Sequence, residues 1–300
     1  MKTKTALILF FLVLATFLQG EVPRLSPQGV DLVTGRYVEN NEDISLKGAI
    51  PLTLRRVFGT SIETPYELGG GWQWQISNMK SKLYQLEEAG EKNSLTQLTI
   101  RSKITGRKFG ELQCKYTGRE LVITDQRARS WNFFFTEAGL LEKVATPGGA
   151  TLAYTYDAGQ IVKRETDEGH ILVNELYTEG NNSVAGTTFT LLPGDFRIGR
   201  VKAQKTVVER GGELQLIAEY LYTPNETTLI EPNGNKSLYV YNEGGEITEL
   251  VTPLTRELFI WKSGHLVKQQ IFDSERTLLL QKEFTFSDEG HPTEETLSGS

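Results

Sequence analysis

Neighbouring acidic residues are the side chains best suited to catalysis, because two carboxylates placed across a cleft can hydrolyse a glycoside. Such pairs occur at Glu87-Glu88, Asp167-Glu168 and Glu294-Glu295. Adjacent residues of a β-strand point to opposite faces of the sheet, so these pairs cannot easily direct both carboxylates at one substrate. The pattern is more typical of solvated turns, and we predict no catalytic residue among them.

Other reactive groups are equally scattered. His170, His265 and His291 lie far apart in the sequence, with no Cys or His at the spacing of metal ligands. The single Cys114 lies in an alternating apolar and polar stretch, where a buried small hydrophobe is more common than a nucleophile. The glycines at 69–71 lack the Lys and helix of a phosphate-binding loop. We therefore expect no metal, no cofactor and no enzymatic activity.

The elements that would carry any site are β-strands. After residue 30, apolar and polar residues alternate, and aromatic and β-branched types are frequent. Almost every such stretch ends at a Gly, often preceded by Asn, Pro, Glu or Ser, which favours a tight turn. The best helical candidate, residues 82–92, is short and interrupted by Gly, so we expect a strand and turn there.

Aromatic residues separated by one position recur along the chain. The pairs are Phe133/Phe135, Tyr154/Tyr156, Tyr220/Tyr222, Tyr239/Tyr241, Phe259/Trp261 and Phe284/Phe286. The steps between their second members are 21, 66, 19, 20 and 25 residues, which predicts a repeated unit with insertions. Each unit has the length of one hairpin, and a single hairpin is marginally stable in water, so the units should stack side by side.

The repeated aromatic residues have two possible roles. Residues at alternate positions share one face of a strand, so the pairs could form a continuous apolar layer between stacked hairpins. They could instead form a platform on which carbohydrate rings stack. We favour packing, because aromatic residues at strand spacing are more often core than ligand contact.

The N-terminus has the build of a secretory signal peptide over residues 1–20, with Lys2 and Lys4 before an apolar run and a Gly at its end. The run is short for a membrane span, and we expect none after its removal. The chain has 300 residues, 38% hydrophobic and 23% charged, with a net charge of −6. An acidic balance argues against nucleic acid as a partner.

Two groups of residues resemble the Rhs family and its YD repeats. The repeat signature, in which a Tyr-Asp pair is followed by Gly, comprises Tyr154, Tyr156, Asp157, Gly159, Tyr239, Tyr241, Gly244, Phe259, Trp261 and Gly264. Residues 26–77 resemble the segment that opens the repeat core of many Rhs proteins. The opening signature comprises Asp31, Gly35, Asp43, Pro51, Leu52, Arg56, Gly69, Gly71 and Trp72.

The resemblance implies an all-β fold of consecutive antiparallel β-hairpins in a large curved or spiralling sheet, part of a shell like that of Rhs effectors, toxin-complex cocoons and teneurins. It divides the chain into a signal peptide (1–20), an opening segment (21–80) and hairpin repeats (81–300). In toxin members the shell holds a toxin released by self-cleavage at an Asp-based motif. No Asp-Pro-x-Gly motif occurs here and nothing toxin-like follows the last unit, so no protease residue is expected.

The expected function is therefore that of an exported structural protein, secreted, on the cell surface or in the periplasm. Its repeats would enclose or present a polypeptide cargo, or continue into a further repeat-containing chain. One alternative is an adhesion module that binds another cell or a cell-surface glycan. Another is the remnant of a longer Rhs protein.

Overall fold

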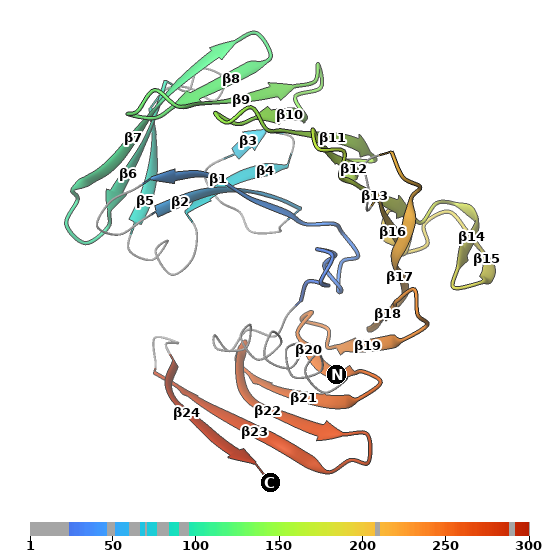
Figure 1. Ribbon diagram of the computed structural model, residues 1–300. Coiled ribbons are helices and arrows are strands. Elements are labelled where there is room, and N and C mark those ends of the chain that lie inside the picture. Colours follow the sequence, from blue (N-terminus) through green and yellow to red (C-terminus); the bar gives the residue numbers. More distant parts are fainter. Residues whose placement is uncertain are drawn as a thin grey trace, which may run out of the picture. The chain divides into compact units, whose positions relative to one another are not determined.

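The computed structural model is all-β, and no helix occurs in the part of the chain that it describes. The described residues are 24–46, 52–59, 67–69, 71–76, 84–89, 96–207, 211–287 and 292–299. The expected signal peptide, Pro51 and His291 lie outside these ranges. Most of the chain forms a long antiparallel sheet of successive hairpins, which confirms the predicted fold class (Figure 1). No helix within the described ranges has the length and apolar character to cross a membrane.

A small sheet in the order β1-β2-β4-β3 is formed by residues of the opening segment. Its strands are β1 (Glu39–Leu46), β2 (Leu52–Phe58), β3 (Glu67–Gly69) and β4 (Trp72–Ile76). The long sheet begins with β5 (Tyr84–Ala89), inside the segment for which the sequence predicted a strand rather than a helix.

The strands of the long sheet pair with their neighbours in chain order. Its earlier strands are β5, β6 (Gln97–Ser102), β7 (Lys108–Thr117), β8 (Glu120–Thr124), β9 (Ser130–Phe135), β10 (Leu141–Ala145), β11 (Thr151–Asp157), β12 (Gln160–Thr166), β13 (Ile171–Leu176) and β16 (Val201–Val207). Its later strands are β17 (Gln215–Thr223), β18 (Glu226–Ile230), β19 (Lys236–Tyr241), β20 (Ile247–Val251), β21 (Thr255–Lys262), β22 (His265–Asp273), β23 (Leu278–Phe286) and β24 (Pro292–Gly299). Between β13 and β16, β14 (Gly180–Val184) and β15 (Thr187–Leu191) form a separate two-stranded sheet.

Glycine-containing turns produce these hairpins. Asp157 pairs with Gln160, and the two residues between them, Ala158 and Gly159, have φ angles of 48° and 74°. Two positive φ angles give a turn whose twist matches that of the flanking strands. After β19 the residue with positive φ is Gly245 (76°), whereas the repeat signature had named Gly244. With two adjacent glycines, the Tyr-to-Gly spacing does not identify which one turns the chain.

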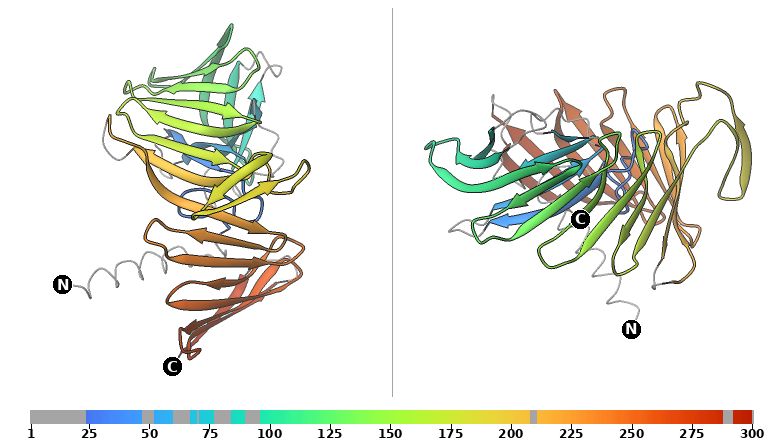
Figure 2. Two further views of the ribbon diagram at one scale, coloured as in Figure 1. Left: turned by 90° about the vertical axis from the view of Figure 1, so that its right-hand side faces the viewer. Right: turned by 90° about the horizontal axis from the view of Figure 1, so that it is seen from above.

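The chain divides into two compact units. The first comprises Arg36–Asn182 and Phe189–Ile217, and the second comprises Met1–Gly35, Ser183–Thr188 and Ala218–Ser300. Figure 2 shows the strands of the long sheet within each unit following one another in chain order. In the first unit, the small sheet packs through Trp74 on Phe133 of β9, with ring centroids 5.4 Å apart.

In the second unit, residues 24–35 pack on β17 and β18. The hydroxyl groups of Ser26 and Tyr220 are 3.0 Å apart, and buried Thr227 donates to the carbonyl oxygen of Leu32. Farther along this unit, a core cluster of Ile247, Leu250, Phe259 and Leu266 is extended by Tyr239, Trp261 and Phe284. The aromatic residues of the repeats are therefore part of the core.

The burial of aromatic side chains supports the packing role. Among the residues whose burial the structure describes, Phe196 is the one Phe, Tyr or Trp with an exposed side chain, and it belongs to a loop. Every residue of the six aromatic pairs is buried or half-buried. Cys114 is also buried, as predicted.

Candidate functional site

Five residues of the opening and repeat signatures meet in one buried group within the first unit. We call it the Arg56 cluster, and its members are Arg56, Asp43, Trp72, Tyr154 and Tyr156. β-Strand alternation places Arg56 and Trp72 on one face of the small sheet, since Arg56 of β2 lies opposite Trp74 of β4 and Phe58 lies opposite Trp72. The two tyrosines come from β11 of the long sheet.

Arg56 and Asp43 form a buried ion pair at the centre. The Arg56 Nη2 atom donates to Asp43 Oδ1 over 3.0 Å, and Nε donates to Oδ2. Their side chains are only 1% and 6% exposed. The carboxylate thus accepts two parallel hydrogen bonds from the guanidinium in addition to the charge attraction. Together these interactions offset the free-energy cost of removing both charges from water.

Aromatic rings enclose the guanidinium. Its central carbon lies 4.8 Å from the ring centroid of Trp72, 5.7 Å from that of Phe133 and 5.8 Å from that of Tyr154. A cation is attracted to the negative face of an aromatic ring, and more strongly when water is absent. Phe133 and Tyr154 belong to the long sheet. Their cation–π contacts with Arg56 therefore help to hold the long sheet against the small one.

Hydrogen bonds connect the same two sheets. The Trp72 indole N–H donates to the Tyr156 phenol oxygen over 2.8 Å, and that phenol donates to the carbonyl oxygen of Leu141 over 2.7 Å. The Asn41 amide donates to the phenol oxygen of Tyr154 over 2.9 Å. The polar atoms of both repeat tyrosines are therefore bound to partners, so these side chains can be buried without an unpaired group.

A second set of polar residues borders the cluster and was missed by the sequence reasoning. Buried Glu39 accepts a hydrogen bond from Tyr37 and, over 2.7 Å, one from Asn41. Arg164 Nε of β12 lies 2.9 Å from Glu39 Oε1, an ion pair without hydrogen-bond geometry. Tyr37, Glu39 and Asn41 alternate in sequence, and that common face was the available signal.

Burial dominates the electrostatics of the cluster. It raises the pKa of Asp43, an effect that the Arg56 charge opposes. Burial also disfavours the Arg56 charge, but Tyr154 and Asp43 outweigh it and raise the pKa of the guanidinium. Burial raises the pKa of Tyr156 to about 12, although the hydrogen bond from Trp72 lowers it. With protonated phenols and a paired Arg56, the arrangement is suited to holding two sheets together.

The remaining signature residues serve turns and the core. In the second unit, Tyr241 and Phe259 are buried, Tyr239 and Trp261 are half-buried, and Gly264 turns the chain with φ 77°. Asp31 accepts backbone hydrogen bonds from Val33 and Thr34 and pairs with Arg24, so it fixes the turn that leads to Gly35. The others are exposed Asp157, Gly159, Leu52 at the start of β2, Gly69 at the end of β3 and Gly71 with φ 85°.

The residues considered for catalysis do not converge. His170 is exposed beside Glu168, and the His265 ring stacks on Phe286 with centroids 4.7 Å apart. The Glu87 carboxylate pairs with Arg101. Within the ranges that the structure describes, no three His, Cys, Asp or Glu side chains gather as metal ligands would.

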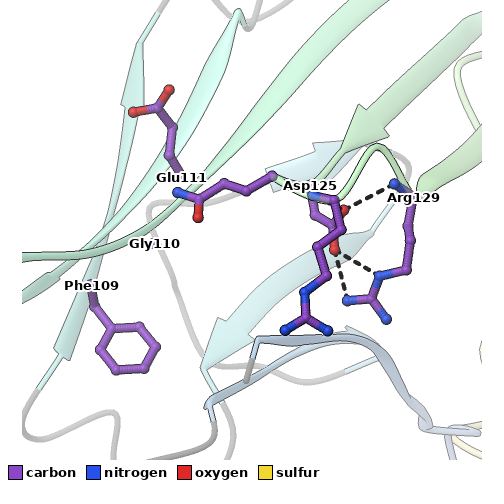
Figure 3. A pocket seen from close by; sticks show the side chains of 7 residues that line it. Phe109, Gly110, Glu111, Asp125 and Arg129 are labelled. Atoms are coloured by element: carbon purple, nitrogen blue, oxygen red, sulfur yellow. Dashed lines mark hydrogen bonds and ion pairs between the residues drawn. The ribbon is translucent and has the colours of Figure 1, made fainter. Parts of the chain in front are cut away.

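A pocket between β7 and the turn after β8 offers no better candidate. Figure 3 shows Phe109, Gly110 and Glu111 on one side and the Asp125 turn on the other. Asp125 is used within the turn, because its carboxylate accepts 2.9 Å hydrogen bonds from the backbone of Arg127 and Arg129 and a 2.8 Å bond from the Arg129 side chain. These bonds lower the pKa of Asp125 despite its desolvation. The Glu111 carboxylate is likewise bound, because it accepts a 2.6 Å hydrogen bond from the Gln113 amide and pairs with Lys108.

One family model matches part of this chain. A family model described as a domain of unknown function, DUF6531, matches residues 28–91, which include Asp43, Arg56 and Trp72. Among curated proteins, no sequence matches the chain.

Several solved structures are similar to this chain at low scores. One is TcdB2-TccC3 without its hypervariable C-terminal region, with 10% identity over 72% of this chain and a TM-score of 0.40. Another is the Tc holotoxin pore of Photorhabdus luminescens, with 12% identity over 89% of this chain and a TM-score of 0.45. A porin-like protein from Bacteroides uniformis has 9% identity over 87% of this chain and 93% of its own, with a TM-score of 0.24. This chain covers 14% and 15% of the first two, and at these scores none of the three constrains its function.

Proposed function

We propose that this chain is an exported Rhs-like structural protein, part of a β-hairpin shell that encloses or presents a polypeptide cargo. The Arg56 cluster carries the proposal. The cluster joins the small sheet to β11 of the long sheet. The side chains that make this contact are the same ones that resemble the Rhs family, and they are used here for packing. Packing of this kind supports a structural role in the wall of a shell. A catalytic role would require side chains that are available to react.

The repeats supply the physical basis for such a wall. Consecutive antiparallel strands pair with one another, so each hairpin within the sheet is joined to the next through its edge strands. The buried aromatic pairs give every unit its own share of core. A sheet assembled in this way can enlarge by adding hairpins, which is what enclosing another polypeptide requires.

Export is part of the same proposal and rests on the N-terminal sequence. The two lysines followed by an apolar run match a signal peptide. Fusing residues 1–30 to a reporter enzyme that is active only outside the cytoplasm should give activity. A matched fusion in which Leu9 and Leu12 are replaced by Arg should be inactive, and activity of both fusions would contradict export by this segment.

Protease protection tests the enclosing role. The longest product of the reading frame that encodes this chain would be purified and digested, and protected fragments identified by mass spectrometry. We expect a segment outside residues 1–300, or a co-purifying polypeptide, to resist digestion until the repeats are denatured. Arg56→Met should abolish protection, whereas Arg107→Met, which removes an exposed guanidinium, should preserve it. A product with no protected polypeptide would overturn the proposal.

A further inference from the structure

The hairpin of β14 and β15 has two unpaired strand edges. These strands pair with each other and with no other strand in the described part of the chain (Figure 1). Ala185 and Gly186 connect them with φ angles of 49° and 77°. A two-residue turn of this kind makes the flanking residues, Val184 and Thr187, a hydrogen-bonded pair. The backbone N–H and C=O groups of Thr188 and Thr190 therefore point away from β14.

Buried side chains and polar contacts hold the hairpin in place. Val184 and Leu191 are buried. The Phe189 ring lies 5.2 Å from the guanidinium carbon of Arg197, and the Thr190 hydroxyl donates to Asn181 Oδ1 over 2.8 Å. The free edges are thus presented on a packed element.

Neither edge carries the usual protection. Natural edge strands avoid pairing with other chains through charged residues, Pro or bulges. From Gly180 to Leu191 the sequence has no charged residue and no Pro. By contrast, β24 carries Glu294 and Glu295 on exposed positions.

The β15 edge is better suited to pairing than the β14 edge. Its sequence, Thr-Thr-Phe-Thr-Leu, has high strand propensity, whereas β14 begins with Gly-Asn-Asn. At the entrance of β14, the buried Asn182 amide donates to the carbonyl oxygens of Thr178 and Gly180 over 2.7 and 3.0 Å. That stretch of backbone is already bound by the chain itself.

We propose that β15 pairs antiparallel with β15 of a second copy of this chain, giving a four-stranded sheet. Centring the pair on Phe189 places Thr188 opposite Thr190 of the second copy, so the outward backbone groups of both residues find partners. Facing threonines are a favourable cross-strand pair. An uncharged edge suits a two-fold axis, since no like charges meet. Leu192, which follows β15 and is 72% exposed, adds apolar surface at each end.

The pairing should be weak and reversible. Five residues of strand edge bury less than the roughly 1,000 Å² expected for a stable specific interface. Dimerisation should therefore depend on concentration, and sedimentation velocity over about a hundredfold range of concentration would detect it.

Proline substitutions at the two edges provide a matched comparison. Thr188→Pro removes an outward N–H of β15 without touching the β14–β15 ladder, because Pro is tolerated where a strand's N–H faces solvent. Ser183→Pro makes the equivalent change on β14, and both residues are exposed. We expect the wild type and Ser183→Pro to dimerise and Thr188→Pro to stay monomeric, with equal circular dichroism.

Lysine variants keep the test decisive if proline disturbs the hairpin. Thr188→Lys brings two like charges to the paired edges and should weaken dimerisation about tenfold, less at high salt. Ser183→Lys should leave it unchanged. A monomeric wild type at every concentration, or a dimer dissociated by the Ser183 variants instead, would overturn the proposal. So would a monomer whose β15 edge binds only an unrelated extended peptide.

Discussion

The indole N–H of Trp72 donates to the phenol oxygen of Tyr156 over 2.8 Å, so β4 of the small sheet is bound directly to β11 of the long sheet. The Tyr156 phenol in turn donates a hydrogen bond to the Leu141 carbonyl oxygen of the neighbouring β10. One tryptophan thereby fixes the small sheet against two strands of the long sheet.

Removing this hydrogen bond from either side should destabilise the protein. Trp72→Phe and Tyr156→Phe should each lower the free energy of unfolding by about 1–3 kcal/mol, because each leaves a buried polar group without its partner. In a double-mutant cycle followed by urea denaturation, the two losses should be less than additive. Strict additivity would show that the two side chains do not interact in solution.

The Arg56–Asp43 pair should be costly to break and cheaper to replace as a whole. Arg56→Met leaves the Asp43 carboxylate buried without its partner and should cost about 3–5 kcal/mol of unfolding free energy. Arg56→Met combined with Asp43→Leu should recover most of that loss. Arg107→Met, at an exposed site, should have no effect in the same urea titration. A double variant no more stable than Arg56→Met would contradict this account.

Gly71 should tolerate a side chain less well than another glycine with the same backbone conformation. Gly71 and Gly139 have φ angles of 85° and 78°, so Ala is strained at both, by about 1–2 kcal/mol. At Gly71 an added Cβ would also lie 3.1 Å from the Phe58 ring, whereas nothing lies within 4 Å at Gly139. Thermal unfolding should show a larger loss for Gly71→Ala, and equal losses would contradict the contact.

The attachment of residues 24–35 to the second unit depends on Thr227. Its hydroxyl donates to the Leu32 carbonyl oxygen, and its side chain is completely buried. Thr227→Val keeps the shape but leaves that carbonyl unpaired, at a cost of about 1–3 kcal/mol. Hydrogen exchange of residues 24–35 should therefore become faster. Thr223→Val, at an exposed position of β17, is the control and should leave exchange unchanged.

Buried phenols should make stability fall at alkaline pH. Burial raises the pKa of Tyr37, Tyr154, Tyr156, Tyr220 and Tyr239, with Tyr156 and Tyr239 at about 12. The unfolded chain ionises these groups near pH 10 and the folded chain does not. Their contribution is therefore complete below about pH 10 and is lost as pH rises toward 12.

Tyrosinate absorbance checks this directly. At about pH 11, the native protein should show less tyrosinate than the same protein in urea, and Tyr156→Phe should reduce the difference by about 0.8 of a tyrosinate. Identical titration curves in the folded and unfolded states would contradict the burial of these phenols.

The sequence could predict hairpins because the information is local. At β11 and β12, alternation sets the faces of Tyr154 and Tyr156, and the Gly at 159 sets the turn. The sequence could not predict that Arg56 contacts Tyr154, because the two residues are 98 positions apart. Alternation shows on which face of a strand a side chain lies, but it does not show which distant side chain packs against that face. Glu39 was missed for a related reason. A glutamate in a sequence normally predicts a solvent-exposed side chain. Glu39 can be buried because Tyr37, Asn41 and Arg164 surround its carboxylate.

The distance in sequence between the small sheet and its covering strands has a consequence during synthesis. Arg56 and Asp43 leave the ribosome 98 residues or more before Tyr154. At roughly 5–20 residues per second, about 5–20 seconds pass before Tyr154 is made. Trp72 and Phe133 are made earlier, but the contacts that join the small sheet to β11 need Tyr154 and Tyr156. The buried surroundings of the ion pair can therefore be completed only after β11 has left the ribosome.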